Sequence, residues 1–282
     1  MTIDTHTHVI STDTTRYPNA PIGGHKSDWS RERPVSVEQM LAAMDQAAVA
    51  KAVLVQASTC YGHDNSYVAD AVAAHPDRFA GVFSVDPLAA EAPDKIRYWA
   101  NRKLAGMRLF TAGSTMPNQA DWIDDPRSFP AWEAASELKL PVCMQMTVQA
   151  IPQLMRMLER FPKATVLLDH LAKPTLSDGP PYGGAADVFR LAEYKNLYLK
   201  LTPRTVKEAQ TGKASPETFF PLLVAKFGAS RITWGSNYPA SEGTLTELLQ
   251  GSQASLSVLS ADDRRSIFAE TALRLYPALA GK

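Results

Sequence analysis

The chain has 282 residues, of which 45% are hydrophobic and 21% charged, and its 29 basic side chains are balanced by 29 acidic ones. This composition excludes a disordered or fibrous protein, and the zero net charge gives no general attraction for nucleic acid or an acidic membrane surface. The first residues carry no export signal, no apolar run is long enough to cross a bilayer, and only two cysteines are present. We therefore expect a cytoplasmic protein without nucleic-acid or membrane partners.

Eight short β-branched or apolar runs alternate with longer helical stretches along the chain. This alternation is typical of βα units around a parallel sheet, and eight strands close a barrel. We predict that residues 1–282 form a single-domain TIM-like (β/α)8 barrel of the α/β class. An open doubly wound sheet gives the same alternation, but the first run lacks the glycine-rich fingerprint of such a sheet. The predicted strands are residues 2–9, 51–58, 79–86, 105–110, 141–146, 164–170, 197–202 and 231–237.

Three of the intervening stretches carry helix signals. Ser36 and Gln39 have the spacing of a capping box ahead of an apolar stripe. A second helix is predicted to follow Ser215 and to end at Gly228, and a third to follow Ser260.

Two long segments, 11–35 and 174–185, are rich in proline, glycine and asparagine. We predict that both are loops, and loops of this length within a compact domain are more often functional than plain spacers.

A pair of histidines in the first run is the strongest chemical signal. His6 and His8 are two residues apart, so in a strand their side chains share a face, with Asp4 below them. If this strand belongs to a barrel, the pair lies at the carboxyl end of the strands, where barrel enzymes hold their active sites. The alternative is two edge histidines that only bond backbone groups.

The motifs "HTH", "VLVQAS", "GMRLF", "DHLAKP", "LKLTPR" and "ITWGSNYP" together resemble the amidohydrolase superfamily. Within it, the sequence is most similar to the branch that includes pyrone-dicarboxylate lactonase and the sugar-acid lactonases. The resemblance extends over nearly the whole chain. It implies a barrel enzyme that acts on the ester of a small lactone.

The resemblance also implies a metal site, formed by two histidines of the first strand, a histidine from each of the fifth and sixth, and an aspartate from the eighth. This sequence supplies His6, His8 and His170, but Gln145 and Asn237 stand at the other two places. Without an anionic protein ligand we expect no metal and no other cofactor, as in the lactonase branch. The alternative is zinc held by the three histidines and a water.

Two arginines are candidates for binding a substrate carboxylate, because the guanidinium fork donates two parallel hydrogen bonds. Arg108 alternates with apolar neighbours and should face away from them, although a structural ion pair would explain it too. Arg204 matches a substrate-binding arginine of the lactonases; its alternative is a solvated loop residue. The pyrone-dicarboxylate enzyme has another arginine after the fourth strand, where "TAGSTMPN" has none. This absence favours a substrate with one carboxylate or a hydroxyl-rich arm.

A polar stripe runs through the seventh predicted strand, where Lys200 shares a face with Tyr198 and Thr202. We predict that this stripe lines the pocket, the alternative being a buried lysine in a structural ion pair. Further substrate-binding candidates, each of which could instead be a polar group beside the pocket, are Ser58, Asn65, Gln145 and Tyr17.

Asn237 stands where the lactonases carry the aspartate that removes a proton from the attacking water. An amide cannot take that proton, although it can still orient a nucleophile by hydrogen bonds. We expect His6, His8 and His170 to surround the ring carbonyl oxygen, where negative charge develops.

Two reactions follow from this arrangement. In a lactonase-type hydrolysis of a small acidic or polyhydroxylated lactone, His170 replaces the missing carboxylate and water opens the ring. In the alternative, a lactone isomerase, a hydroxyl group of the substrate attacks, since an internal nucleophile has an effective molarity of about 10⁵–10⁸ M. A barrel that binds a sugar acid or lactone without turnover is a third hypothesis. A metal-dependent decarboxylase is disfavoured because two ligands are missing, and the oligomeric state is left open.

Overall fold

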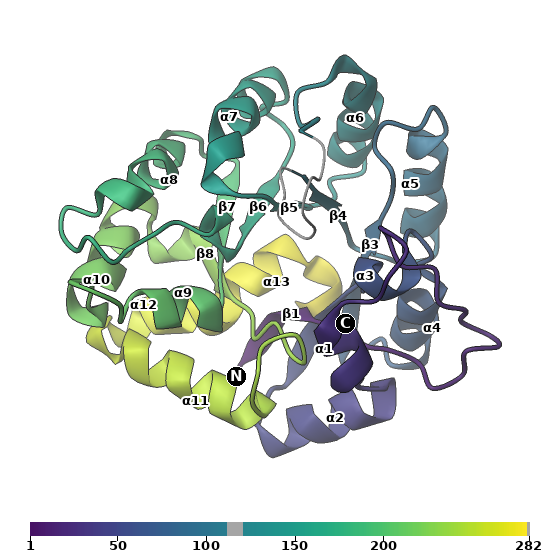
Figure 1. The fold of residues 1–282 in the computed structure, drawn as a ribbon, viewed down its shortest axis with the longest axis horizontal. Coiled ribbons are helices and arrows are strands. Elements are labelled where there is room, and N and C mark those ends of the chain that lie inside the picture. Colours follow the sequence, from purple (N-terminus) through teal and green to yellow (C-terminus); the bar gives the residue numbers. More distant parts are fainter. Residues whose placement is uncertain (112–120, 281–282) are drawn as a thin grey trace.

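The computed structural model describes residues 1–111 and 121–280, and eight parallel strands within them form one sheet in chain order (Figure 1). Each strand lies inside one of the predicted runs, which confirms the α/β barrel class. The strands are β1 (Ile3–Thr7), β2 (Lys51–Val55), β3 (Phe79–Ser84), β4 (Gly106–Phe110), β5 (Val142–Gln145), β6 (Val166–Asp169), β7 (Leu197–Leu201) and β8 (Ile232–Trp234).

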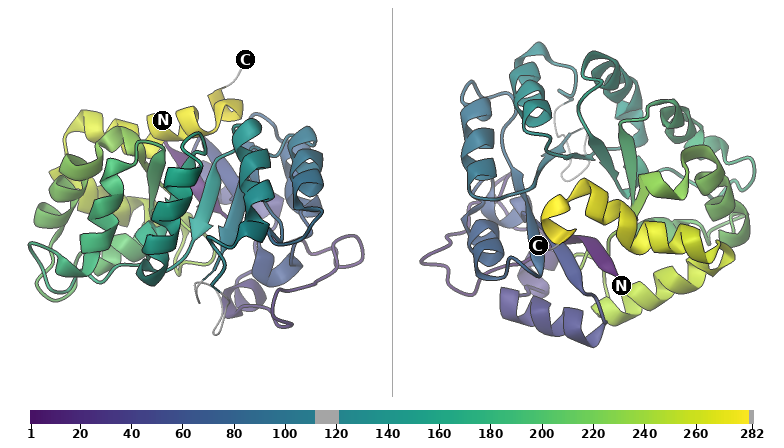
Figure 2. Two further views of the ribbon diagram at one scale, coloured as in Figure 1. Left: turned by 90° about the horizontal axis from the view of Figure 1, so that it is seen from above. Right: turned by 180° about the vertical axis from the view of Figure 1, so that it is seen from behind.

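Helices surround the strands on the outside (Figures 1 and 2). They are α1 (Asp28–Glu32), α2 (Val37–Gln46), α3 (Ser58–Tyr61), α4 (Ser66–Ala74), α5 (Ala92–Asn101), α6 (Phe129–Glu137), α7 (Ile151–Arg160), α8 (Ala186–Arg190), α9 (Pro203–Glu208), α10 (Pro216–Phe227), α11 (Leu245–Ser255), α12 (Ala261–Arg265) and α13 (Thr271–Leu275). Within the described ranges, no helix has the length and apolar character needed to span a membrane.

The predicted helix starts are confirmed, with differences in detail. Ser36 and Gln39 form the capping box of α2. Ser215 precedes α10 and Gly228 follows it, but the Ser215 hydroxyl bonds the side chain of Thr218 rather than a backbone amide. Segment 11–35 is not a plain loop, because it contains the short helix α1.

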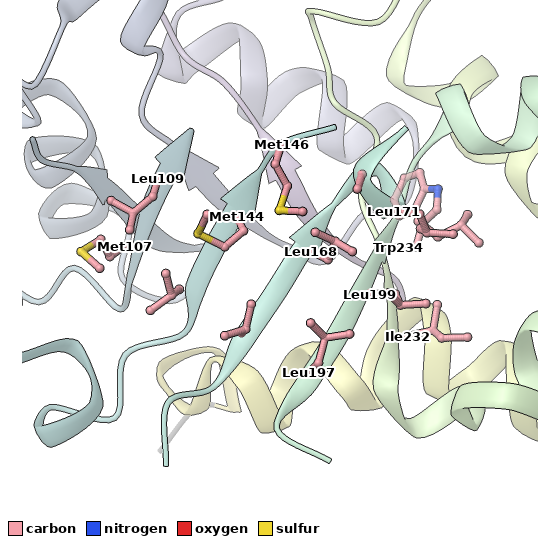
Figure 3. Packing of buried hydrophobic residues seen from close by; sticks show 14 of the residues in the cluster. Met107, Leu109, Met144, Met146, Leu168, Leu171, Leu197, Leu199, Ile232 and Trp234 are labelled. Carbon is pink, nitrogen blue, oxygen red and sulfur yellow. The ribbon is translucent and has the colours of Figure 1, made fainter. Parts of the chain in front are cut away.

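The strands alternate between two buried faces. Outward side chains pack against the helices, among them Met107, Met144 and Leu168 (Figure 3). A second apolar cluster includes residues of β1, β2, β3, β5 and β6 together with the C-terminal helix α13. Lys51 at the start of β2 donates to the Leu279 carbonyl after α13, so this helix covers the amino ends of the strands. The opposite end of the barrel is left for polar groups.

The barrel is nearly closed by backbone contacts that run past the end of β8. The backbone amide of Asn237 donates to the His6 carbonyl at 2.8 Å, and the backbone amide of His8 donates to the Tyr238 carbonyl at 2.9 Å. Asp4 accepts the amide of Ser236 at 2.9 Å. We refer to these contacts between the first strand and residues 235–238 as the seam. The seam fixes the backbone of His6 in β1 and of His8 directly after it.

Gly235 lies in the seam with no room for a side chain. A Cβ atom there would lie 2.6 Å from the Cβ of His6 and 2.9 Å from its amide nitrogen. Neither atom can rotate away, so Gly235→Ala must separate the two segments. We expect this variant to lower the free energy of unfolding by about 2 kcal/mol in chemical denaturation.

The matched control is Gly251→Ala within α11, where a Cβ would have no described atom within 4 Å. Removing a glycine from a helix interior should raise the stability by about 0.5–1 kcal/mol. If both variants changed the free energy of unfolding equally, the claim that the seam has no room for a side chain at position 235 would be wrong.

Candidate active site

A cavity of about 390 Å³ lies at the carboxyl ends of the strands. Its size suits a small organic molecule. None of the described residues that line it is acidic, whereas Arg108, Lys173 and Arg204 bring three basic groups. The lining residues are His8, Ser27, Trp29, Ala57, Ser58, Thr59, Arg108, Phe110, Gln145, His170, Lys173, Arg204, Asn237, Ala240 and Ser241.

The three predicted histidines are brought together at the floor of this cavity. The ring centroids of His6 and His8 are 4.9 Å apart, and those of His6 and His170 are 5.1 Å apart. His8 and His170 line the cavity, while His6 is fully buried behind them. Neither ring nitrogen of His6 has a hydrogen-bond partner among the described residues.

Hydrogen bonds give different roles to the two imidazoles that line the cavity, those of His8 and His170. His8 Nδ1 lies 2.7 Å from the Val55 carbonyl oxygen, which can only accept, so Nδ1 carries the proton and Nε2 is an acceptor. His170 Nδ1 lies 2.8 Å from the Thr202 hydroxyl, which can donate, so Nε2 of His170 is able to carry a proton into the cavity. Of these two rings, only neutral His170 can therefore donate to a carbonyl oxygen.

All three imidazoles are held neutral. Burial, followed by the nearby Arg108 cation, lowers the pKa of His8 to about 3. Burial likewise lowers the pKa of His170 to about 3, although the Asp169 carboxylate opposes the shift. The pKa of His6 is lowered well below its ordinary value by burial and then by Lys200. Each ring is thus a poor proton acceptor near neutral pH.

Asp169, at the end of β6, is the buried centre of an ion-pair network below the cavity. Its Oδ1 lies 2.8 Å from Lys200 Nζ, and its Oδ2 accepts from Arg108 Nε at 3.2 Å. His6 Nδ1 lies 3.9 Å from Oδ1. Burial alone would raise the pKa of Asp169, but the two cations outweigh it and hold the pKa below its ordinary value. The carboxylate therefore stays charged.

Lys200 does not line the cavity, which corrects the prediction for the polar stripe of β7. It is fully buried and paired with Asp169, and its Nζ also lies 3.8 Å from Cys143 Sγ. Its side chain points into the barrel as expected, but below the level of the cavity floor. The structural ion pair is the correct alternative.

The two arginines both reach the cavity. Arg108 lines it while paired with Asp169, so the substrate-facing placement and the ion pair occur together. Arg204 lies in α9 and is exposed at the cavity mouth. The segment "TAGSTMPN", from which the additional arginine is missing, lies almost entirely outside the described residues.

The four weaker candidates divide evenly. Ser58 and Gln145 line the cavity. Asn65 does not, because its amide is fully buried and bonds both backbone groups of Ser84. Tyr17 does not either, since its hydroxyl donates to the Asp70 carboxylate of α4. For Asn65 and Tyr17 the prediction of a substrate-facing residue is therefore corrected.

Asn237 lines the cavity from the seam. Its backbone has a φ of +56°, an uncommon conformation that asparagine tolerates better than most residues. Its Nδ2 donates to Ser241 Oγ at 3.1 Å. This bond leaves Oδ1 as the amide atom that can accept from a bound hydroxyl or water.

Several lining residues were not predicted from the sequence, among them Trp29 and Lys173. Trp29 of α1 packs over His8, with ring centroids 5.1 Å apart. Lys173 enters from a turn after β6, η3 (His170–Ala172), within the motif "DHLAKP". The motif was quoted for the resemblance but no role was given to its lysine, and nothing in the apolar pattern singled out Trp29.

The turn after β6 is left-handed. The φ angles of His170, Leu171, Ala172 and Lys173 are +54°, +53°, +58° and +57°. For L-residues this conformation costs about 1–2 kcal/mol each, and such residues normally occur singly. The surrounding structure must hold the turn, and its result is that both His170 and Lys173 face the cavity.

A sequence model of the amidohydrolase family matches residues 3–278. The chain belongs to the amidohydrolase family. A curated relative, the L-fucono-1,5-lactonase of Burkholderia ambifaria, is 30% identical over 211 residues, which cover 74% of this chain and 70% of the relative.

Solved amidohydrolases share the fold. A candidate 2-pyrone-4,6-dicarboxylic acid hydrolase from Pseudomonas putida is 23% identical with a TM-score of 0.78, covering 98% of this chain and 97% of that one. An amidohydrolase from Burkholderia multivorans with bound zinc is 19% identical with a TM-score of 0.77, covering 98% and 99%. At these identities the likeness concerns the fold alone.

The donor set of this amidohydrolase differs from the metal site that the resemblance implies. The unpartnered nitrogens of buried His6 could serve a metal or a polar ligand atom. However, the ends of β5 and β8 present the amides Gln145 and Asn237. Over residues 1–111 and 121–280, no three His, Cys, Asp or Glu side chains are grouped to hold a metal ion. The residues present do not fit the metal set that the resemblance implies.

Removing one partner of the buried Asp169 carboxylate should destabilise the fold. Lys200→Met keeps the volume of the side chain but leaves Asp169 paired only with Arg108. Removing one partner of a buried pair costs about 3–5 kcal/mol, so we expect a loss near the lower value in urea denaturation. The double variant Lys200→Met/Asp169→Asn should recover part of it.

An exposed pair serves as the control for this measurement. Arg190→Met breaks the ion pair with Asp187 on the surface of α8, and we expect no measurable change. A similarly small effect of Lys200→Met would show that the buried network is not stabilising.

Proposed function

We propose that this amidohydrolase opens the ester ring of a small acidic or polyhydroxylated lactone by attack of an oxygen nucleophile on the carbonyl carbon, without a metal. The observation that carries the proposal is that His170, whose Nδ1 lies 2.8 Å from the Thr202 hydroxyl, and Arg108 line the same cavity. These groups can stabilise the negative charge on the carbonyl oxygen in the tetrahedral intermediate.

The roles of the three histidines differ in this proposal. His170 donates to the carbonyl oxygen, with its ring oriented by Thr202. His8 presents an acceptor nitrogen, which suits a hydroxyl group of the substrate or the nucleophile. His6 is buried in contact with the rings of His8 and His170 and close to Asp169. In this proposal it supports the packing of the two other rings.

The charges around the cavity support an anionic substrate or product. Arg108 and Arg204 are permanent cations, and no acidic side chain occurs among the described lining residues. Ring opening of any lactone releases a carboxylate, which these groups would bind. The similarity to an L-fucono-1,5-lactonase supports a sugar lactone, to which Ser58 and Gln145 can offer hydrogen bonds to hydroxyl groups.

A second candidate function, lactone isomerisation, is favoured by Asn237. An amide at this place can orient a hydroxyl group of the substrate by hydrogen bonds without removing its proton. A hydroxyl held against the carbonyl then competes with water through its high effective molarity. The product is a rearranged lactone.

The test is a panel of neutral and acidic sugar lactones incubated with the enzyme in H₂¹⁸O and followed by NMR and mass spectrometry. We expect turnover well above the uncatalysed rate for at least one lactone, unchanged by a chelator. Label in the carboxylate indicates hydrolysis, and an unlabelled new lactone indicates isomerisation. Binding of lactones without turnover of any of them would overturn both hydrolysis and isomerisation, and would indicate a binding protein.

The amide at 237 should decide between the two products. In Asn237→Asp a carboxylate that can take a proton faces the cavity, and we expect the ratio of labelled acid to rearranged lactone to increase about tenfold or more. Asn237→Gln is the control, because it keeps an amide. If both variants partition the substrate as the wild type does, residue 237 does not determine the outcome.

A further inference from the structure

We propose that Lys173 is the catalytic residue that accepts the proton of the nucleophile in this cavity, in place of the carboxylate that position 237 lacks. The inference rests on the proposed lactone chemistry and assigns the proton transfer that this chemistry requires. It is drawn from the position of Lys173, from the bonds of the other lining groups and from a small cavity beside it.

The other described lining groups are unsuited to the role. The side chains of Asn237, Gln145 and Ser58 do not gain a proton near neutral pH, and the arginines do not lose one. The two histidines of the lining are acceptors of very low basicity, for the reasons of burial given above. An amine, in contrast, can take a proton and return it.

The backbone brings this amine to the reacting groups. The left-handed turn places Lys173 three residues after His170, and the Lys173 amide donates to the His170 carbonyl at 2.9 Å. Both side chains line the same cavity. A strained turn that presents His170 and Lys173 together puts a donor for the carbonyl oxygen beside an acceptor for the nucleophile.

The charges that face Lys173 make it a usable base. Burial, followed by the cations Arg204 and Arg108, lowers the pKa of Lys173 to about 8, while Asp169 opposes the shift. Glu208 of α9 is the other charged group beside it, across the small cavity described next. About a tenth of the amine is therefore neutral at pH 7, and about half at pH 8.

A second, small cavity lies between Lys173 and Glu208 and would let the amine equilibrate its proton with solvent between turnovers. Its volume of about 10 Å³ is close to the smallest that holds one water molecule. Lys173, Arg204 and Glu208 are among its lining residues, and it adjoins the main cavity at His170. A water there would connect the amine to the partly exposed Glu208 carboxylate and so to solvent.

The proposed step balances as follows. The neutral amine takes a proton from water while the water oxygen bonds to the carbonyl carbon, and the carbonyl electrons move to the oxygen beside His170. When the intermediate collapses, the bond to the ring oxygen breaks and the ammonium returns the proton to that oxygen. The product is a hydroxy acid, whose new acidic proton is lost to solvent. In isomerisation the substrate hydroxyl replaces water.

The test compares Lys173→Arg and Lys173→Met with the wild type on a lactone that the panel identifies. The wild-type kcat/KM, corrected for uncatalysed opening, should rise with pH and level off above about 8. Lys173→Arg keeps the positive charge but cannot act as a base near neutral pH. We therefore expect kcat/KM to fall about 10²-fold or more in both variants and to lose this pH dependence. Circular dichroism checks that they fold.

The matched control is Lys139→Met, an exposed lysine that also has a positive φ, of +55°. We expect wild-type kinetics from it. In the double variant Lys173→Met/Asn237→Asp, a carboxylate should regain at least about tenfold of the loss, because it supplies a second proton acceptor. A purely structural lysine would not be rescued in this way.

Chemical restoration gives an independent readout. Lys173→Cys treated with 2-bromoethylamine carries a lysine-like amine of lower basicity, and its pH profile should level off at a lower pH than that of the wild type. Treated wild type is the control, since Cys60 and Cys143 are buried.

Two results would overturn the assignment while leaving the lactone activity in place. One is Lys173→Arg within threefold of the wild type, and the other is a wild-type pH profile that stays flat from pH 6 to 9. If the wild type turns over no lactone of the panel, the proposed function itself fails first.

Discussion

The Asp169 carboxylate balances two cations that enter the barrel, and the arrangement of the site follows from that balance. Arg108 from β4 and Lys200 from β7 are buried with it, and charges at such depth are tolerated only in pairs. The pairs tie three strands together at one level. Because His170 follows Asp169 directly, the same ion pairs fix the point at which the chain turns into the cavity.

Burial and the nearby cations together determine the protonation of the site. Burial disfavours imidazolium, and Arg108 adds to this effect, so the histidines remain neutral donors or acceptors rather than acids. Burial, with Arg204 and Arg108, disfavours the ammonium of Lys173 as well, though less strongly. An environment that stabilises a developing oxyanion thus also keeps more of the Lys173 amine neutral near pH 8 and so available to accept a proton. The loss of the carboxylate at position 237 and the presence of Lys173 are consistent parts of one design.

Much of this arrangement could be predicted from the sequence, because strand periodicity determines which face a residue occupies. The eight runs located the strands, and the alternation placed Arg108 and Lys200 on the inner face. The alternation could not predict how deep in the barrel the Lys200 side chain lies, because depth depends on the register between strands. Lys200 is the register partner of Asp169 across β6 and β7, below the cavity floor. For Asn65 and Tyr17, polar character alone could not separate a substrate contact from a bond to a neighbouring strand or helix.

The turn from His170 to Lys173 could not be predicted, because local energetics oppose it. Four consecutive L-residues with positive φ are disfavoured in any short peptide, and only the packed barrel holds them there. Trp29 was missed for a related reason. A segment rich in proline and glycine was interpreted as a loop, while the stacking of Trp29 on His8 depends on where α1 settles.

The seam also has a consequence for how the protein folds. Its contacts join residues that are far apart along the chain; the Asp4 carboxylate, for example, accepts from the Ser236 backbone amide across 232 positions. The entropy of closing so large a loop grows only slowly with its length, but contacts of this range form late. His6 and His8 acquire their final backbone positions only when the ring is complete. A partly assembled barrel, even one with most of its strands paired, would therefore be without a working site.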